Sequence, residues 1–294
     1  MAGLLKPIHN AADFRLEMQR LKAASGRVGF VPTMGALHEG HLSLIKTARA
    51  HADVVACSIF VNPKQFDRPD DLNRYPQQLD ADLAALERAG VRLVFVPTVE
   101  EMYPSGFQTT VSVADVSQGL CGGARPGHFD GVATVVCKFL LIGLPDVAVF
   151  GEKDYQQLMV IRRMVRDLSL PVEIVGSPTV RAADGLALSS RNQHLTQEER
   201  ALAPLFHQNL LATATALQAG GDVCELLATG SHKLESDGFI VDYFELRDEL
   251  TLAPLTNVDQ NRPARLLAAV WLGKTRLIDN VALSLREPFR DTAE

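Results

Sequence analysis

The chain of 294 residues is longer than one compact domain usually is, so two domains that share a cleft are expected. Hydrophobic residues make up 47% and charged residues 22%, which is the usage of an ordinary folded protein and leaves little room for a long disordered region. The formal net charge of -6 argues against a nucleic-acid-binding protein, which would carry a basic surplus, although a local cluster of cations can still hold a single nucleotide.

Up to Arg191, short β-rich runs alternate with amphipathic segments long enough for helices. The β-rich runs predict strands at Arg27–Thr33, Asp53–Val61, Val91–Val96, Asp146–Phe150 and Val172–Val175. Apolar residues at helical spacing predict helices at Gly40–His51, Leu79–Ala89, Gly131–Ile142 and Tyr155–Leu168. Strands separated by helices imply crossover connections, so the sequence predicts an α/β fold with a Rossmann-like parallel sheet flanked by helices.

Beyond Arg191 the pattern changes. Periodicity predicts helices at about Gln197–Gln218 and Cys224–Ser236, followed by two strand-like runs at Phe239–Arg247 and Arg265–Leu272. These elements are typical of a second, smaller α+β domain. We therefore expect a Rossmann-like nucleotide-binding domain at residues 1–181 and a C-terminal α+β domain at residues 182–294.

No apolar run in the sequence reaches the length that a bilayer-spanning helix needs, and the first residues lack the apolar segment and cleavage site of a signal peptide. We therefore expect a cytoplasmic protein that has no membrane partner. The four cysteines, Cys57, Cys121, Cys137 and Cys224, form no C-x-x-C pair and are interpreted as reduced thiols.

Four polar signatures follow the predicted strands of the first domain. They are PTMGALHEGH at Pro32–His41, NPKQF at Asn62–Phe66, GEKD at Gly151–Asp154 and LSSRN at Leu188–Asn192. In an open parallel sheet, ligands bind at the carboxyl ends of the strands, because loops and helix N-termini converge there. The placement of these signatures therefore predicts a binding site at that edge of the sheet.

The first signature suits a phosphate group. Gly35 permits a tight turn, and Gly40 lets a phosphate approach the start of the next helix. His38 and His41 can share one helical face, so both imidazoles can donate hydrogen bonds to negative charge that develops as the α-phosphorus is attacked. The alternatives are a polar helix cap or a metal-binding pair. Zinc is disfavoured because the segment is not H-E-x-x-H and no third ligand is suggested nearby.

The other signatures add cations and amides. Lys153 is a point charge for phosphate, while LSSRN supplies two hydroxyls and the guanidinium of Arg191. Gln65 and Gln157 are neutral amides that can orient a hydroxylated carboxylate without adding a charge that resists its activation. Taken singly, each of these residues is also compatible with an ordinary solvated loop.

Two glycine-containing segments are interpreted as something other than nucleotide sites. LGKT at Leu272–Thr275 resembles the end of a P-loop, but Ala268 stands where the first glycine is needed and a strand-like run occupies the place of the loop. GLCGGARPG at Gly119–Gly127 lacks the G-x-G-x-x-G order and does not lie between a strand and a helix. We expect a mobile loop there.

Taken together, PTMGALHEGH, SIFVNPKQF, RPGHFDGVATVV, VFGEKDYQQL and DGLALSSRN closely resemble the pantothenate synthetases, also called pantoate-beta-alanine ligases. DYFELRD and WLGKTRLIDN extend the resemblance into the second domain. The resemblance implies a nucleotidylyltransferase-like fold with an H-x-G-H signature, ATP as a substrate, magnesium as a cofactor and a homodimer. It also implies that pantoate attacks the α-phosphate of ATP to give pantoyl adenylate and pyrophosphate, and that β-alanine then displaces AMP to give pantothenate.

The resemblance also implies which residues form the site. ATP contacts are implied for Met34, Gly35, Ala36, Leu37, His38, Glu39, Gly40, His41, Gly151, Glu152, Lys153, Asp154, Val180, Leu188, Ser189, Ser190 and Arg191. His41 is implied as the catalytic proton donor, and with His38, Lys153 and Arg191 it makes up the expected catalytic set. Gln65 is implied to contact pantoate and β-alanine, and Gln157 to contact pantoate.

An acyl adenylate hydrolyses readily, so the site should exclude water between the two half-reactions. We expect the segment Phe66–Pro76, together with a second domain that serves as lid and dimer domain, to close over the bound intermediate.

Other functions share some of these features. A nucleotidyltransferase that leaves the nucleotide in its product would use the same fold and histidine pair, and a non-catalytic nucleotide-binding module would share the fold alone. A fragment of an aminoacyl-tRNA synthetase would share the H-x-G-H signature but would need an RNA-binding surface. The acidic balance and the lack of a basic arm argue against that surface.

Overall fold

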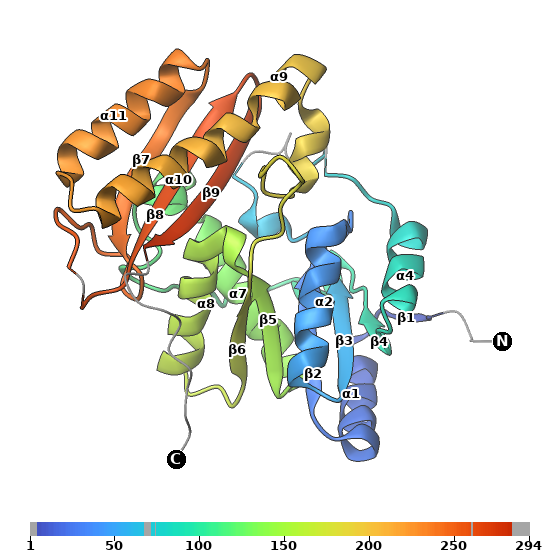
Figure 1. The fold of residues 1–294 in the computed structure, drawn as a ribbon. Helices are drawn as coiled ribbons and strands as arrows, with labels where there is room; N and C mark the ends of the chain where they lie inside the picture. The colour runs from blue at the N-terminus through green and yellow to red at the C-terminus, as the bar shows by residue number, and fades with distance from the viewer. Residues whose placement is uncertain (1–4, 68–71, 74, 260, 284–294) are drawn as a thin grey trace. The chain divides into compact units, whose positions relative to one another are not determined.

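A computed structural model describes residues 5–67, 72–73, 75–259 and 261–283 of the chain (Figure 1). The chain divides into two compact units, Met1–Val180 and Arg181–Glu294. Among the described residues, no helix is both long and apolar enough to cross a membrane. The four cysteines are free thiols, and all but Cys224 are buried.

The first unit is built on a parallel sheet. Within its described residues, six strands lie in the order β1-β4-β3-β2-β5-β6, and every neighbouring pair is parallel. The strands are β1 at Pro7–Ile8, β2 at Val28–Thr33, β3 at Val54–Ile59, β4 at Leu93–Phe95, β5 at Val147–Gly151 and β6 at Glu173–Ser177. The predicted Rossmann-like sheet is thereby confirmed. β1 was not predicted, because two residues are too few to show a pattern.

Helices cover both faces of this sheet (Figure 1). The helices of this unit are α1 at Ala11–Ser25, α2 at Glu39–His51, α4 at Leu79–Arg88, α5 at Val99–Met102, α6 at Leu120–Ala124, α7 at His128–Gly143 and α8 at Tyr155–Asp167, with 3-10 turns η1 at Pro63–Gln65 and η2 at Glu152–Asp154. Successive residues of β2 point to opposite faces. Phe30 packs with Phe14 of α1 and Phe139 of α7, whereas Val31 belongs to the core that contains Ile45 of α2. α1 and α7 therefore lie on one face and α2 on the other.

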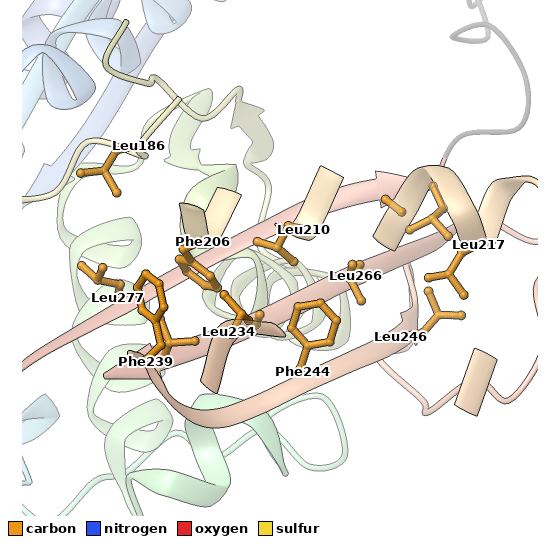
Figure 2. Packing of buried hydrophobic residues seen from close by; sticks show 14 of the residues in the cluster. Leu186, Phe206, Leu210, Leu217, Leu234, Phe239, Phe244, Leu246, Leu266 and Leu277 are labelled. Carbon is orange, nitrogen blue, oxygen red and sulfur yellow. The ribbon is translucent and has the colours of Figure 1, made fainter. Parts of the chain in front are cut away.

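The second unit packs helices on one face of an antiparallel sheet, as its predicted α+β character requires. In its described residues the strand order is β7-β8-β9. The elements are η3 at Ser190–His194, α9 at Gln197–Leu202, α10 at Pro204–Gln218, α11 at Val223–Ser236, β7 at Ile240–Asp248, β8 at Ala264–Leu272 and β9 at Thr275–Leu283. Phe206 and Leu210 of α10, Leu234 of α11 and Phe244 of β7 meet in its core (Figure 2).

The continuous helix predicted at Gln197–Gln218 is wrong. Two helices, α9 and α10, meet there at Ala203. Pro204 has no N–H with which to continue the first helix, but its fixed φ suits the first position of a new one.

The LGKT segment is the turn of a hairpin. Leu272 pairs with Thr275 where β8 runs into β9, a strand that was not predicted, and Gly273 has a positive φ of 55°. Two-residue hairpin turns need such a conformation, so the glycine serves the hairpin and not a phosphate.

The mobile loop expected at Gly119–Gly127 is also wrong, because this segment contains α6. The buried amide of Gln156 anchors the helix: its Oε1 accepts the N–H of Cys121, and its Nε2 donates to the carbonyl of Gly119. A Cβ at Gly122 would lie 1.7 Å from the carbonyl oxygen of Ser117, so the glycine permits close packing.

Candidate active site

The strand order of the first unit places two loops side by side. β2 lies between β3 and β5, and after β2 the chain fills one side of the sheet with β3 and β4 before it crosses to β5 and β6. The loop after β2 and the turn η2 after β5 therefore leave adjacent parallel strands at the same edge. Such a reversal of strand order is where open α/β sheets bind their ligands.

The loop after β2 contains a strained turn. Gly35 and Ala36 have positive φ values of 82° and 51°, and the second of these is costly for a residue with a side chain. Asp82 of α4 holds the turn, because its two carboxylate oxygens accept the N–H groups of Ala36 and Leu37, each at 2.9 Å. Asp82 is only 2% exposed, and a Cβ at position 35 would lie 2.9 Å from its Oδ2. The shape of the turn thus depends on both a glycine and a distant carboxylate.

His38 and His41 close the start of α2. His38 is the N-cap residue, and its Nδ1 accepts the N–H of Gly40 at 3.1 Å. Nδ1 of His41 in turn accepts the N–H of His38 at 3.3 Å. Because each Nδ1 is an acceptor, the proton of each neutral ring is on Nε2. The histidine pair is therefore a helix cap and a pair of Nε2–H donors at the same time.

The surroundings keep both imidazoles neutral. Burial, followed by the His38 ring, lowers the pKa of His41 to about 3, with Lys153 acting in the same direction and Asp154 against it. Burial, followed by the charge of Lys153, also lowers the pKa of His38. At neutral pH each ring can donate a hydrogen bond, but neither carries an extra proton to release.

Lys153 supplies positive charge at this site. It lies in η2, its side chain is 16% exposed, and its Nζ is 3.7 Å from a carboxylate oxygen of Asp154. The charges of Lys153 and Asp154 act on both His38 and His41. Gly151 ends β5, and Glu152 begins η2. The first unit thus brings the H-x-G-H segment and the GEKD loop close enough for their charges to interact.

Gln65 lies in η1, which follows β3, the other neighbour of β2. Its Oε1 accepts a hydrogen bond from Nδ2 of Asn62 at 3.0 Å. Its main-chain carbonyl accepts from Nδ1 of His128 at 2.7 Å and from Arg125 at 3.1 Å. Among the described residues no acceptor faces Nε2 of Gln65, so this N–H group can serve a ligand.

Helix α7 packs directly on the loop that carries Gln65. A Cβ at Gly131 would lie 2.2 Å from the carbonyl oxygen of Lys64 and 2.7 Å from the nitrogen of Gln65. Nδ2 of Asn62 donates to the Gly131 carbonyl at 3.1 Å. The glycine therefore sets how closely helix and loop can approach.

The structure places the other predicted residues individually. Gln157 is half-buried in the first turn of α8, and Val180 is the last residue of the first unit. Leu188, Ser189, Ser190 and Arg191 belong to the second unit. There Oγ of Ser189 caps η3 by accepting the N–H of Arg191 at 3.3 Å, and Arg191 is exposed. Contact of these four residues with ATP stays a prediction, as does every other predicted contact with ATP or the acid.

Sequence reasoning did not predict the contacts by which four residues support the loops of the candidate site. They are Asn62, Asp82, Arg125 and His128. A signal existed for Asp82, which falls at the helical spacing of Leu79 and Leu86 and so stands where an apolar residue would be expected. Arg125 and His128 lie within the RPGHFDGVATVV segment, but the partner of each becomes visible only in the folded chain.

A family model described as Pantoate-beta-alanine ligase matches residues 6–282 of the chain. The pantothenate synthetase of Stutzerimonas stutzeri is 52% identical over 282 residues, which are 95% of this chain and 98% of that protein. The pantothenate synthetase of Paramagnetospirillum magneticum is 53% identical over 286 residues, which are 96% of this chain and 99% of that protein.

Solved structures are similar over nearly the same length. The crystal structure of pantothenate synthetase from Thermus thermophilus superimposes with a TM-score of 0.87 and 46% identity, and the match covers 95% of this chain and 100% of that one. Pantoate-beta-alanine ligase from Francisella tularensis, solved in complex with beta-gamma ATP and beta-alanine, gives a TM-score of 0.79 and 36% identity. That match covers 94% of this chain and 97% of the Francisella chain.

Proposed function

The chain belongs to the pantoate-beta-alanine ligase family, and we propose that it joins pantoate to β-alanine at the expense of ATP. Pantoate first forms pantoyl adenylate with release of pyrophosphate, and β-alanine then displaces AMP to give pantothenate. The observation that carries this proposal is the reversal of strand order at β2 and β5, where two neutral imidazoles lie within the electrostatic influence of Lys153.

The first half-reaction needs stabilisation of charge at the α-phosphate. A carboxylate oxygen of pantoate attacks the α-phosphorus, and negative charge grows on the equatorial oxygens and on the departing pyrophosphate. His41 and His38 donate Nε2–H hydrogen bonds to this charge, and the ammonium of Lys153 adds electrostatic attraction. Because the rings are neutral, His41 acts here as a hydrogen-bond donor, a narrower role than the proton donor that the family resemblance implied.

The acid must be held without neutralising its nucleophilic oxygen. Nε2 of Gln65 offers an N–H donor to a carboxylate or hydroxyl oxygen of pantoate, and Gln157 offers a second neutral amide. A lysine or arginine in these positions would stabilise the carboxylate before the attack and slow it. In the second half-reaction the amine of β-alanine attacks the acyl carbon, and AMP leaves.

We propose that ATP is used as its magnesium complex. Mg²⁺ is commonly held by one or two carboxylates together with substrate phosphates, and when bound here it would neutralise charge on the leaving pyrophosphate. Asp154, whose charge acts on both histidines, is an oxygen donor of the type that Mg²⁺ prefers.

We also propose that the second unit completes the site with Leu188–Arg191 and acts as lid and dimer domain of a cytoplasmic homodimer. The resemblance to the family supports these roles. The other part of the expected lid is the segment Phe66–Pro76, of which residues 68–71 and 74 lie outside the described residues.

The test is pantoate-dependent exchange of labelled pyrophosphate into ATP, followed by measurement of AMP when β-alanine is added. We expect exchange without the amine and stoichiometric AMP and pantothenate once the amine is present. If no acid supports exchange, the proposed activity is wrong, and a product that retains the nucleotide would indicate a nucleotidyltransferase instead.

A further inference from the structure

A hydrogen-bond chain runs from Tyr103 in the first unit to Gln65. The hydroxyl of Tyr103, at the end of α5, donates to Oδ1 of Asn62 at 2.7 Å, and Nδ2 of Asn62 donates to Oε1 of Gln65 at 3.0 Å. Asn62 is 1% exposed, so both contacts are shielded from bulk solvent. Every step of the chain is therefore made by protein groups.

The direction of this chain follows from its backbone contacts. Oδ1 of Asn62 also accepts the N–H of Lys64, which can only donate, and Nδ2 also donates to the carbonyl of Gly131, which can only accept. A flipped Asn62 amide would place donor against donor and acceptor against acceptor. Asn62 therefore presents N–H to Gln65, and the Gln65 amide must turn its oxygen inward and its Nε2 outward.

We propose that Tyr103 is a positioning residue of the acid subsite, which acts through Asn62 to hold the Gln65 amide with its N–H directed to the acid. This inference rests on the proposed function, in which Gln65 contacts pantoate. Oδ1 of Asn62 accepts two hydrogen bonds, one from the N–H of Lys64 and one from the hydroxyl of Tyr103. Without that hydroxyl, the Asn62 amide loses one of the contacts that fix its orientation.

The ring of Tyr103 is itself fixed by its neighbours. It packs edge-on against Phe107 with centroids 5.2 Å apart, and Nζ of Lys64 lies 5.1 Å from its centroid. A phenylalanine at position 103 would keep both ring contacts and lose only the hydroxyl. Phe107 supplies the matched control, since it contacts the same ring and the same lysine but does not reach Asn62.

The kinetic test measures pantoate-dependent pyrophosphate exchange in Tyr103→Phe and Phe107→Leu. For Tyr103→Phe we expect the KM for pantoate to rise about 3- to 10-fold while the KM for ATP stays within about 2-fold, because the loss is one hydrogen bond. Phe107→Leu removes no hydrogen bond to Asn62, so both KM values should stay within about 2-fold even if the variant has a lower Tm. An unchanged pantoate KM in Tyr103→Phe, or the same rise in Phe107→Leu, would overturn the proposal.

The route through Gln65 is tested by a double-mutant cycle. In a Gln65→Ala background, Tyr103→Phe should have no further effect on the pantoate KM, because the residue on which it acts is missing. Additive effects of the two substitutions would show that Tyr103 acts by another route.

A second readout does not depend on catalysis. The side-chain amide signal of Gln65 in a ¹⁵N spectrum, identified by its loss in Gln65→Ala, should move in Tyr103→Phe and stay in place in Phe107→Leu. If the native enzyme shows no pantoate-dependent exchange, the proposed function fails, and this signal still decides whether Tyr103 positions Gln65.

Discussion

The rings of His38 and His41 lie with their centroids 4.2 Å apart, and the backbone N–H of His38 donates to Nδ1 of His41. The backbone N–H of Gly40 likewise donates to Nδ1 of His38. Each backbone contact leaves the ring proton on Nε2, which is the nitrogen that the cap does not use. The start of α2 therefore determines which nitrogen of each imidazole can act on a substrate.

Replacement of His41 by alanine should reduce pyrophosphate exchange on the order of a hundredfold or more, because the proposed donor to the transition state is lost. His41→Asn is the informative companion, since asparagine also offers a neutral N–H and should recover part of the rate. The rates of exchange at saturating ATP and pantoate measure both effects. Full activity in the alanine variant would remove His41 from the mechanism.

The neutral state of His41 can be tested by pH. Burial, then the His38 ring, lowers its pKa from 6.5 to about 3, so between these values the unfolded chain binds a proton that the folded chain does not. The stability contributed by this group is present above pH 6.5 and is lost as the pH falls toward 3. The ring signal of His41, identified by its loss in His41→Ala, should keep its neutral chemical shift from about pH 8 to about pH 5. A titration near pH 6.5 would contradict the assignment.

Gln65→Ala should weaken the use of pantoate more than the binding of ATP, because under the proposed function its amide binds the acid. Gln65→Glu should be the more harmful change: the carboxylate turns an acceptor and a negative charge toward an anionic acid, and a loss of about tenfold beyond alanine is expected. The KM values for pantoate and ATP, measured separately, decide the matter. Equal effects on both substrates would contradict the role given to Gln65.

Asp82→Ala should raise the KM for ATP about tenfold or more, because Ala36 then loses the acceptor that offsets its strained φ. Asp80→Ala is the matched control, since Asp80 is exposed in the same first turn of α4 and should change the KM for ATP by less than about 2-fold. If both variants behave alike, the turn does not depend on the Asp82 carboxylate.

Asp279→Ala should destabilise the second unit by about 2–4 kcal/mol, because Arg181 loses a bidentate partner that is 4% exposed. Arg200→Ala breaks the exposed pair with Asp184 and should cost less than about 1 kcal/mol. The single tryptophan, Trp271, lies on β8, so its fluorescence during urea unfolding reports on this unit. Equal shifts of the urea midpoint in the two variants would contradict the importance of burial.

The parallel sheet of the first unit could be predicted because its strands are short apolar runs followed by polar loops. β3 at Val54–Ile59 is buried along its whole length, and such a run stands out in one sequence. The strand order could not be predicted, since it depends on pairing between distant segments. Local chemistry at Pro204 was sufficient to foresee two helices, but the continuous apolar spacing on both sides of it concealed the break.

The features of the candidate site also differ in how far the sequence predicts them. The glycines and histidines of the loop after β2 could predict a phosphate site because they lie close together in the sequence. The support that Asp82 gives to Ala36, and the chain from Tyr103 through Asn62, join residues that are tens of positions apart and depend on burial. A single sequence does not show which distant residues contact each other in the folded chain.

The close approach of α7 at Gly131 also limits how the protein can be redesigned. Any side chain at position 131 would clash with the carbonyl of Lys64, so the space beside this loop cannot be reshaped by a substitution at Gly131. Even one methyl group at position 131 would displace either α7 or the loop that carries Gln65. A change of substrate range is therefore better sought away from this contact, and under the proposed function Gln157 on α8 is the first residue to vary.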